Sequence, residues 1–197
     1  MQQSSLEALL VSTGVVALGE MGDKTQLLAM LLAVRFRKPV PIVAGILVAT
    51  LLNHAGAGIV GNWVARELAP DLLRWVIGIA FIAMAAWMLV PDHLDDDDAP
   101  QAQRFGVFGT TLLAFFLAEM GDKTQIATVA LAARYPDLVA VVAGTTLGML
   151  IADVPAVFIG DKLAQKIPMK IVHGVAAAIF AALGIATLAG VGASIGF

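Results

Sequence analysis

The sequence contains no cysteine and has few charged residues. The lack of cysteine excludes disulfides, thiolate metal sites and cysteine nucleophiles. Only 14% of the 197 residues are charged, whereas 59% are hydrophobic and the mean hydropathy is +0.89. Soluble domains carry about 25% charged residues, so this composition is far from theirs. The sequence therefore predicts an all-α polytopic membrane protein whose main solvent is lipid.

Bracketing the apolar runs between charges and prolines predicts six transmembrane helices of about 20 residues each. The predicted spans are Leu6 to Val34, Val40 to Val64, Leu72 to Val90, Gly106 to Ala133, Leu138 to Gly160 and Ile171 to Val191. The first and fourth spans are each interrupted near the middle by a charged cluster. The one long polar stretch, residues 91–104, contains four consecutive aspartates, Asp95 to Asp98, and is typical of a solvated linker.

The two halves on either side of this linker are copies of one another. Residues Glu20 to Gln26, EMGDKTQ, recur letter for letter as Glu119 to Gln125. In the same ungapped register Gly45 falls on Gly144. Residues 1–90 are thus predicted to be a first three-helix repeat, 91–104 an acidic cytoplasmic linker and 105–197 a second repeat. Since each repeat has an odd number of spans, the second must enter the membrane from the opposite side. This gives an inverted repeat whose motifs face each other.

The distribution of Lys and Arg over the connections predicts the orientation. One side of the membrane collects Arg35, Arg37, Lys38, Arg104, Lys162, Lys166 and Lys170, and the other has Arg66, Arg74 and Arg134. The positive-inside rule makes the richer side cytoplasmic, so we expect a multi-pass protein of the cell inner (plasma) membrane with both termini outside the cytoplasm. No basic stripe for nucleic acid is present.

The duplicated motif places charges where the bilayer tolerates them least. Glu20 and Glu119 fall near the centres of their spans, where a charge costs about 2.5 to 3.5 kcal/mol. On a continuous helix Asp23 and Lys24 would share the face of Glu20, at i+3 and i+4, so we expect mutual hydrogen bonds within each motif. Gly22 within that face permits either close helix approach or a local break that frees backbone carbonyls.

These residues predict a metal site made of oxygen ligands. The predicted ligands are the carboxylates of Glu20, Asp23, Glu119 and Asp122 and the amide oxygens of Gln26 and Gln125. Such ligands suit Mn, Ca or Mg rather than Zn or Cu. Each motif carries two carboxylates and one ammonium, so the facing pair has a net charge of −2. One divalent cation or two protons would neutralise it, which is the logic of a metal/proton antiporter.

Several further residues are predicted to support the site or to couple protons to it: Lys24, Thr25, Lys123, Thr124, Asp153, Asn53 and His54. The two lysines are expected to hold the carboxylates and keep them ionised, with a purely structural ion pair as the alternative. Asp153 lies inside the fifth span and occupies the repeat position of His54. An ionisable residue at that depth is a functional hypothesis by default, although a hydrogen bond between packed helices would also account for either side chain.

The doubled motif resembles the signature E-x-G-D-[KR]-[ST] of the Gdt-type cation/proton exchangers, over nearly the whole chain. The signature maps onto Glu20, Gly22, Asp23, Lys24 and Thr25 and again onto Glu119, Gly121, Asp122, Lys123 and Thr124. The resemblance implies Mn²⁺ or also Ca²⁺ as the transported ion, protons as the counter-ion and no cofactor. The short length is similar to that of bacterial members, for which manganese efflux is implied.

Three alternatives to manganese/proton exchange stay open at this stage. A Ca²⁺/H⁺ exchanger would use the same oxygen ligands. A passive cation channel would use buried carboxylates without coupling. An intramembrane aspartyl protease would also use two membrane aspartates, but a single dyad would serve it, and a lysine beside each glutamate in both copies fits an ion site better. The sequence leaves open whether the chain forms a homo-oligomer.

Overall fold

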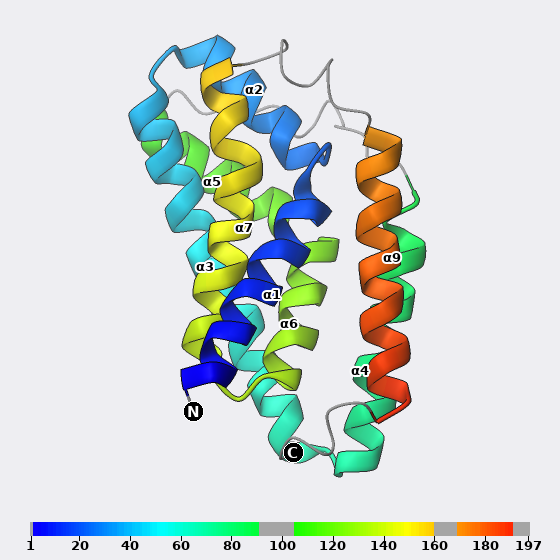
Figure 1. Cartoon of the computed structure of the whole chain (residues 1–197). Helices are drawn as coiled ribbons and strands as arrows, with labels where there is room; N and C mark the ends of the chain where they lie inside the picture. Colours follow the sequence, from blue (N-terminus) through cyan, green and yellow to red (C-terminus); the bar gives the residue numbers. More distant parts are fainter. Residues whose placement is uncertain (1, 91–104, 160–168, 191–197) are drawn as a thin grey trace.

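The computed structural model describes residues 2–90, 105–159 and 169–190, and within them the chain is helical apart from short turns. The helices lie side by side in an elongated bundle (Figure 1). Their bounds are α1 Gln2–Glu20, α2 Lys24–Phe36, α3 Pro39–Glu67, α4 Pro70–Trp87, α5 Gly106–Glu119, α6 Lys123–Arg134, α7 Leu138–Ile159 and α9 Met169–Leu188. The predicted all-helical architecture is confirmed. The predicted acidic linker, together with Lys162 and Lys166, lies outside the described residues.

The helices long and apolar enough to cross a membrane are fewer than the six predicted spans. Over the described ranges these are α3, α4, α7 and α9, and the pair α1–α2 makes a fifth if it is taken as one bent span. The predicted fourth span is divided into α5, of 14 residues, and α6, of 12 residues, and neither reaches the length of a spanning helix. The motif inside that span interrupts it.

The helices alternate in direction along the bundle. The colour gradient of Figure 1 shows α1, α4 and α7 running toward one end and α3, α6 and α9 running toward the other. Helices at equivalent positions of the two sequence repeats therefore run in opposite directions: α3 against α7, and α4 against α9.

The two sequence repeats are interleaved rather than packed as separate bodies. Helix α1 packs against α7 as α3 packs against α5, and α2 packs against α7 as α3 packs against α6. Within each of these two comparisons the contacts are equivalent under the repeat register. Gly45 on α3 faces Thr111 on α5, and Gly144 on α7 faces Ser12 on α1, at the equivalent positions. An ideal Cβ would come within 2.7 Å of Thr111 in the first case and 2.9 Å of Ser12 in the second. The absence of a side chain thus permits both close approaches.

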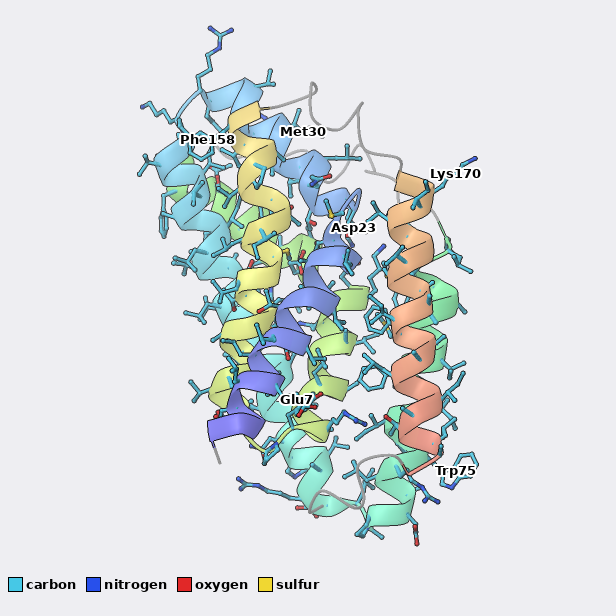
Figure 2. All side chains as sticks on the ribbon, viewed as in Figure 1. Glu7, Asp23, Met30, Trp75, Phe158 and Lys170 are labelled. Carbon is cyan, nitrogen blue, oxygen red and sulfur yellow. The ribbon has the colours of Figure 1, made fainter. Side chains whose placement is uncertain are left out.

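Large apolar side chains lie on the outer surface of the bundle, whereas several acidic side chains are buried in it. Large apolar side chains are exposed on the outer surface, including Trp75 at 52% and Phe158 at 63%, and Figure 2 shows Trp75 directed away from the helices. Buried positions at the two motifs hold acidic side chains instead, among them Glu20 and Asp23, both fully buried. This distribution suits a protein surrounded by lipid with a polar site in its interior.

Candidate metal site

Both copies of the motif break their helix at the glycine. Helix α1 ends at Glu20 and α2 begins at Lys24, with a bend of 70° between them. Gly22 has φ 84° and Gly121 has φ 77°, a left-handed conformation that strains any residue with a Cβ. Of the two roles predicted for these glycines, the structure therefore contains the local break. The prediction that Glu20, Asp23 and Lys24 share one face of a continuous helix is wrong.

The lysines pair across the repeats rather than within their own motif. Lys24 Nζ lies 3.3 Å from Asp122 Oδ1, and Lys123 Nζ lies 2.5 Å from Asp23 Oδ1. The helix break explains why the lysines change partners, because each lysine starts a new helix and no longer follows its own glutamate by one helical turn. The crossed pairs bring the two motifs face to face, as the sequence predicted, although with different partners.

Three of the four predicted carboxylates form a cluster. One oxygen each from Glu20, Asp23 and Asp122 lies within 4.8 Å of the others, and all three side chains are buried. Figure 2 labels Asp23, which lies beside the break between α1 and α2. Glu119 is equally buried but lies outside this group of three in the described chain. The spacing matches what a hard divalent cation needs from several oxygen ligands.

The glutamates of the two motifs are each held by a threonine of the same motif. Thr25 Oγ1 donates to Glu20 Oε2 at 2.7 Å, and Thr124 Oγ1 donates to Glu119 Oε2 at 3.3 Å. The second oxygen of each glutamate is buried and has no hydrogen-bond partner among the described residues. A buried carboxylate oxygen in that state is costly unless a cation or a proton is supplied.

The glutamines cap the breaks with the same amide oxygens that were predicted to bind metal. Gln26 Oε1 accepts a hydrogen bond from the Gly22 N–H at 3.0 Å, and Gln125 Oε1 accepts one from the Gly121 N–H at 2.8 Å. Gln26 also donates through Nε2 to the Ala152 carbonyl at 2.9 Å. The geometry therefore gives both glutamines a role in holding the break, which the sequence pattern did not reveal.

The secondary candidates lie on α3 and α7 beside the two breaks. Asp153 follows Ala152, the residue bonded by Gln26, and neither of its buried carboxylate oxygens has a hydrogen-bond partner in the described part of the chain. Asn53 Nδ2 donates to the Phe116 carbonyl on α5 at 3.1 Å. His54 is fully buried, and both of its ring nitrogens also lack a partner among the residues described.

One contact at the first break has no signal in the sequence. His173 on α9 places Nε2 2.9 Å from the Met21 carbonyl oxygen. The repeat register could not have indicated it, because the equivalent position in the first repeat is Arg74.

Comparison with known proteins gives the family. Residues 8–96 and 107–194 match the family described as "Divalent cation/proton antiporter GDT1". A Vibrio cholerae protein named "Putative manganese exporter" is 49% identical over 183 residues, which cover 92% of this chain and 90% of that protein. "GDT1-like protein 3" of Oryza sativa subsp. indica is 30% identical, over 88% of this chain and 71% of that protein. A GDT1-like protein of Synechocystis is 30% identical, over 84% and 89% respectively.

No solved structure matches the chain. The family match covers both sequence repeats, with both copies of the motif inside the matched ranges. Its members are described as transporters, which decides against the protease alternative, and as antiporters, which decides against a passive channel. The buried charged motifs in an apolar helical bundle are consistent with this match. The chain belongs to the GDT1 family of divalent cation/proton antiporters.

Proposed function

We propose that this antiporter exports Mn²⁺ in exchange for protons, by alternating access to a site between the two motif breaks. The observation that carries the proposal is the cluster of Glu20, Asp23 and Asp122, with one oxygen from each within 4.8 Å of the others. Manganese is supported by the oxygen-only ligand set and by the printed name of the Vibrio cholerae relative.

In this proposal the clustered carboxylates bind the ion, and Glu119 completes the acidic set. Lys24 and Lys123 hold Asp122 and Asp23 through the crossed ion pairs. The two motifs together carry a net charge of −2, which either one divalent ion or two protons would balance. Because an uncompensated buried charge is heavily penalised, the empty, unprotonated site is disfavoured. This penalty links release of the metal to uptake of protons.

Asp153, Asn53 and His54 are proposed to support proton exchange. Asp153 and His54 are buried, at equivalent repeat positions, with polar atoms that lack partners among the described residues. Asn53 donates to the carbonyl of Phe116 on α5, three residues before Glu119, so it lies next to the second motif. At the equivalent repeat position, Ala152 lies next to the first motif through its hydrogen bond with Gln26. A buried ionisable group in a membrane helix marks an ion or proton path by default.

The membrane arrangement proposed is two inverted three-helix repeats, residues 1–90 and 105–197, giving six spans in the plasma membrane. It is supported by the opposite directions of α3 and α7 and of α4 and α9 (Figure 1). It is also supported by the equivalent close contacts of Gly45 and Gly144. In this arrangement the broken pairs α1–α2 and α5–α6 each cross once, both termini lie outside the cytoplasm and residues 91–104 connect the repeats inside.

Flux measurements on the purified protein in liposomes test the proposal. Proteoliposomes loaded with a Mn²⁺-sensitive dye and carrying an acidic interior should take up Mn²⁺ and release protons in a fixed ratio. Collapsing the pH gradient with a protonophore should abolish concentrative uptake. Mn²⁺ flux that proceeds without any proton movement would refute the exchange mechanism.

A Ca²⁺/H⁺ exchanger is the second candidate, because oxygen ligands of this kind also suit Ca²⁺. Competition separates the two, with Mn²⁺ uptake measured at increasing Ca²⁺ and Mg²⁺ concentrations. Half-inhibition by Ca²⁺ below the KM for Mn²⁺ would make calcium the preferred substrate.

A further inference from the structure

We propose that His173 is a positioning residue for metal binding at the first motif. Through its hydrogen bond to the Met21 carbonyl, it fixes the break that carries Glu20 and Asp23. The inference rests on the proposed function in one respect, that these two carboxylates bind the transported ion.

The contact itself requires His173 to be the donor. A carbonyl oxygen can only accept, so the Nε2 atom 2.9 Å from Met21 O must carry a hydrogen. Met21 follows the last residue of α1, and carbonyls at a helix end have no partner within the helix. The contact is partly buried, and a carbonyl that is shielded from water and unpaired is costly. His173 therefore supplies, from another helix, the donor that this end of α1 lacks.

The position of Met21 makes this bond relevant to the ligands. Glu20 precedes Met21 by one residue and Asp23 follows it by two, so both carboxylates extend from the segment that His173 holds. Two further hydrogen bonds lie within the motif and fix its local shape, the Gly22 N–H to Gln26 Oε1 and the Asp23 N–H to the Glu20 carbonyl, at 3.0 Å each. Gln26 also ties the break to α7, and the crossed ion pairs tie it to the second motif. His173 adds the tie to α9.

The second motif shares the local anchors but has a different residue at the equivalent distant position. The Gly121 N–H donates to Gln125, and the Asp122 N–H donates to the Glu119 carbonyl at 3.1 Å. The residue equivalent to His173 is Arg74, which pairs instead with the exposed Asp71 one turn away, at 3.8 Å. His173 thus distinguishes two motifs whose seven residues are identical.

The register also supplies the matched control. We would compare His173→Phe and His173→Leu, which lack a donor, with His173→Gln, which keeps one, and with Arg74→Leu at the equivalent position. KM and maximal rate for Mn²⁺ would be measured in proteoliposomes. Residues that orient metal ligands typically contribute 10- to 100-fold to affinity. We expect KM to rise about tenfold in the Phe and Leu variants, with a maximal rate within about twofold of wild type.

The other two variants decide whether the hydrogen bond is the cause. His173→Gln should restore KM to within about threefold of wild type, and Arg74→Leu should leave it unchanged. A normal KM in the folded Phe or Leu variant would overturn the inference, as would a Gln variant as impaired as the Leu variant. Using two donor-free side chains of different shape keeps the test open if one fails to fold.

A metal-free measurement separates this inference from the proposed function. Hydrogen exchange at the Gly22 and Asp23 amides should be faster in His173→Phe than in wild type, and His173→Gln should restore it. If hydrogen exchange at these amides responds in this way but the wild-type protein moves no Mn²⁺, the proposed function fails and the positioning contact stands. If the wild-type protein transports Mn²⁺ and neither exchange nor KM responds, the positioning role is refuted.

Discussion

The two copies of the motif have the same seven residues but unequal surroundings. Lys123 is completely buried and pairs with Asp23, which is also fully buried. Lys24 pairs with Asp122, but its side chain is 24% exposed. Identical letters therefore do not produce identical sites, because burial depends on which helices pack against each copy. The difference in burial therefore lies between the two crossed pairs, one sealed and one partly exposed, and each pair takes one residue from each motif.

The ends of the bundle differ in a related way. Beyond the second motif, Tyr135 donates to Glu7 on α1 at 3.3 Å, and Arg134 donates to Thr187 on α9 at 2.6 Å. The positions equivalent to Tyr135 and Glu7 in the other copy are Phe36 and Gly106, which cannot form the first of these hydrogen bonds. The end at which α1 begins is thus tied by a hydrogen bond that the equivalent residues Phe36 and Gly106 cannot form.

The largest effect should separate the two glutamates. Glu20→Gln removes a member of the clustered carboxylates and should weaken Mn²⁺ binding on the order of a thousandfold, whereas Glu119→Gln should weaken it roughly tenfold. Calorimetry in detergent measures both affinities, and Glu7→Gln, near the end of the bundle, is the control. Equal losses in the two motif variants would mean that both copies contribute alike to the bound ion.

Removing the lysines should test the difference in burial. Lys123→Met leaves a fully buried carboxylate without its cation, so it should lower the free energy of unfolding by about 3 kcal/mol. Lys24→Met should lower it by about 1 kcal/mol, because water still reaches that pair. Chemical denaturation in detergent at neutral pH gives both values. A Lys24 variant as unstable as the Lys123 variant would contradict the asymmetry.

The glutamines should show a smaller difference of the same kind. Gln26 makes two hydrogen bonds, whereas Gln125 makes one within the described part of the chain, to the glycine of its own break. Gln26→Ala should therefore cost about 2 kcal/mol and Gln125→Ala about 1 kcal/mol of unfolding free energy. The same denaturation assay measures both. Glu substitutions, which keep the acceptor, serve as controls and should recover part of each loss.

The smallest effect should come from the tie at the end of the bundle. Tyr135→Phe removes one hydroxyl at the edge of the protein and should cost about 0.5 kcal/mol. Its counterpart Phe36→Tyr adds a hydroxyl at the equivalent position, but the residue equivalent to Glu7 is Gly106, which has no acceptor side chain, so this change should not stabilise the protein. Thermal melts in detergent compare the two. A stabilised Phe36→Tyr variant would show that both ends can form such a tie.

Much of the architecture follows from hydropathy and from the repeat. Apolar runs predicted an all-helical membrane protein, and the spacing of Gly22 and Gly121 within charged motifs allowed the observed breaks. The exact helix bounds did not follow, because α5 and α6 are separated by backbone geometry at Gly121 rather than by a change in hydropathy. The partners of Lys24 and Lys123 were predicted wrongly for the same reason, since the i, i+4 rule holds only for an unbroken helix.

The sequence alone determines which residues make up the site: two copies of the same acidic residues, lysines and glycines, placed within apolar segments where lipid would exclude them. This follows from local chemistry, because apolar runs and glycines act over a few residues. Folding in three dimensions settles the pairing: Lys123 with Asp23, Gln26 with Ala152, His173 with Met21. These partners are far apart in the chain or belong to different repeats. They meet only because α6, α7 and α9 pack beside the first break, and no local pattern encodes those contacts.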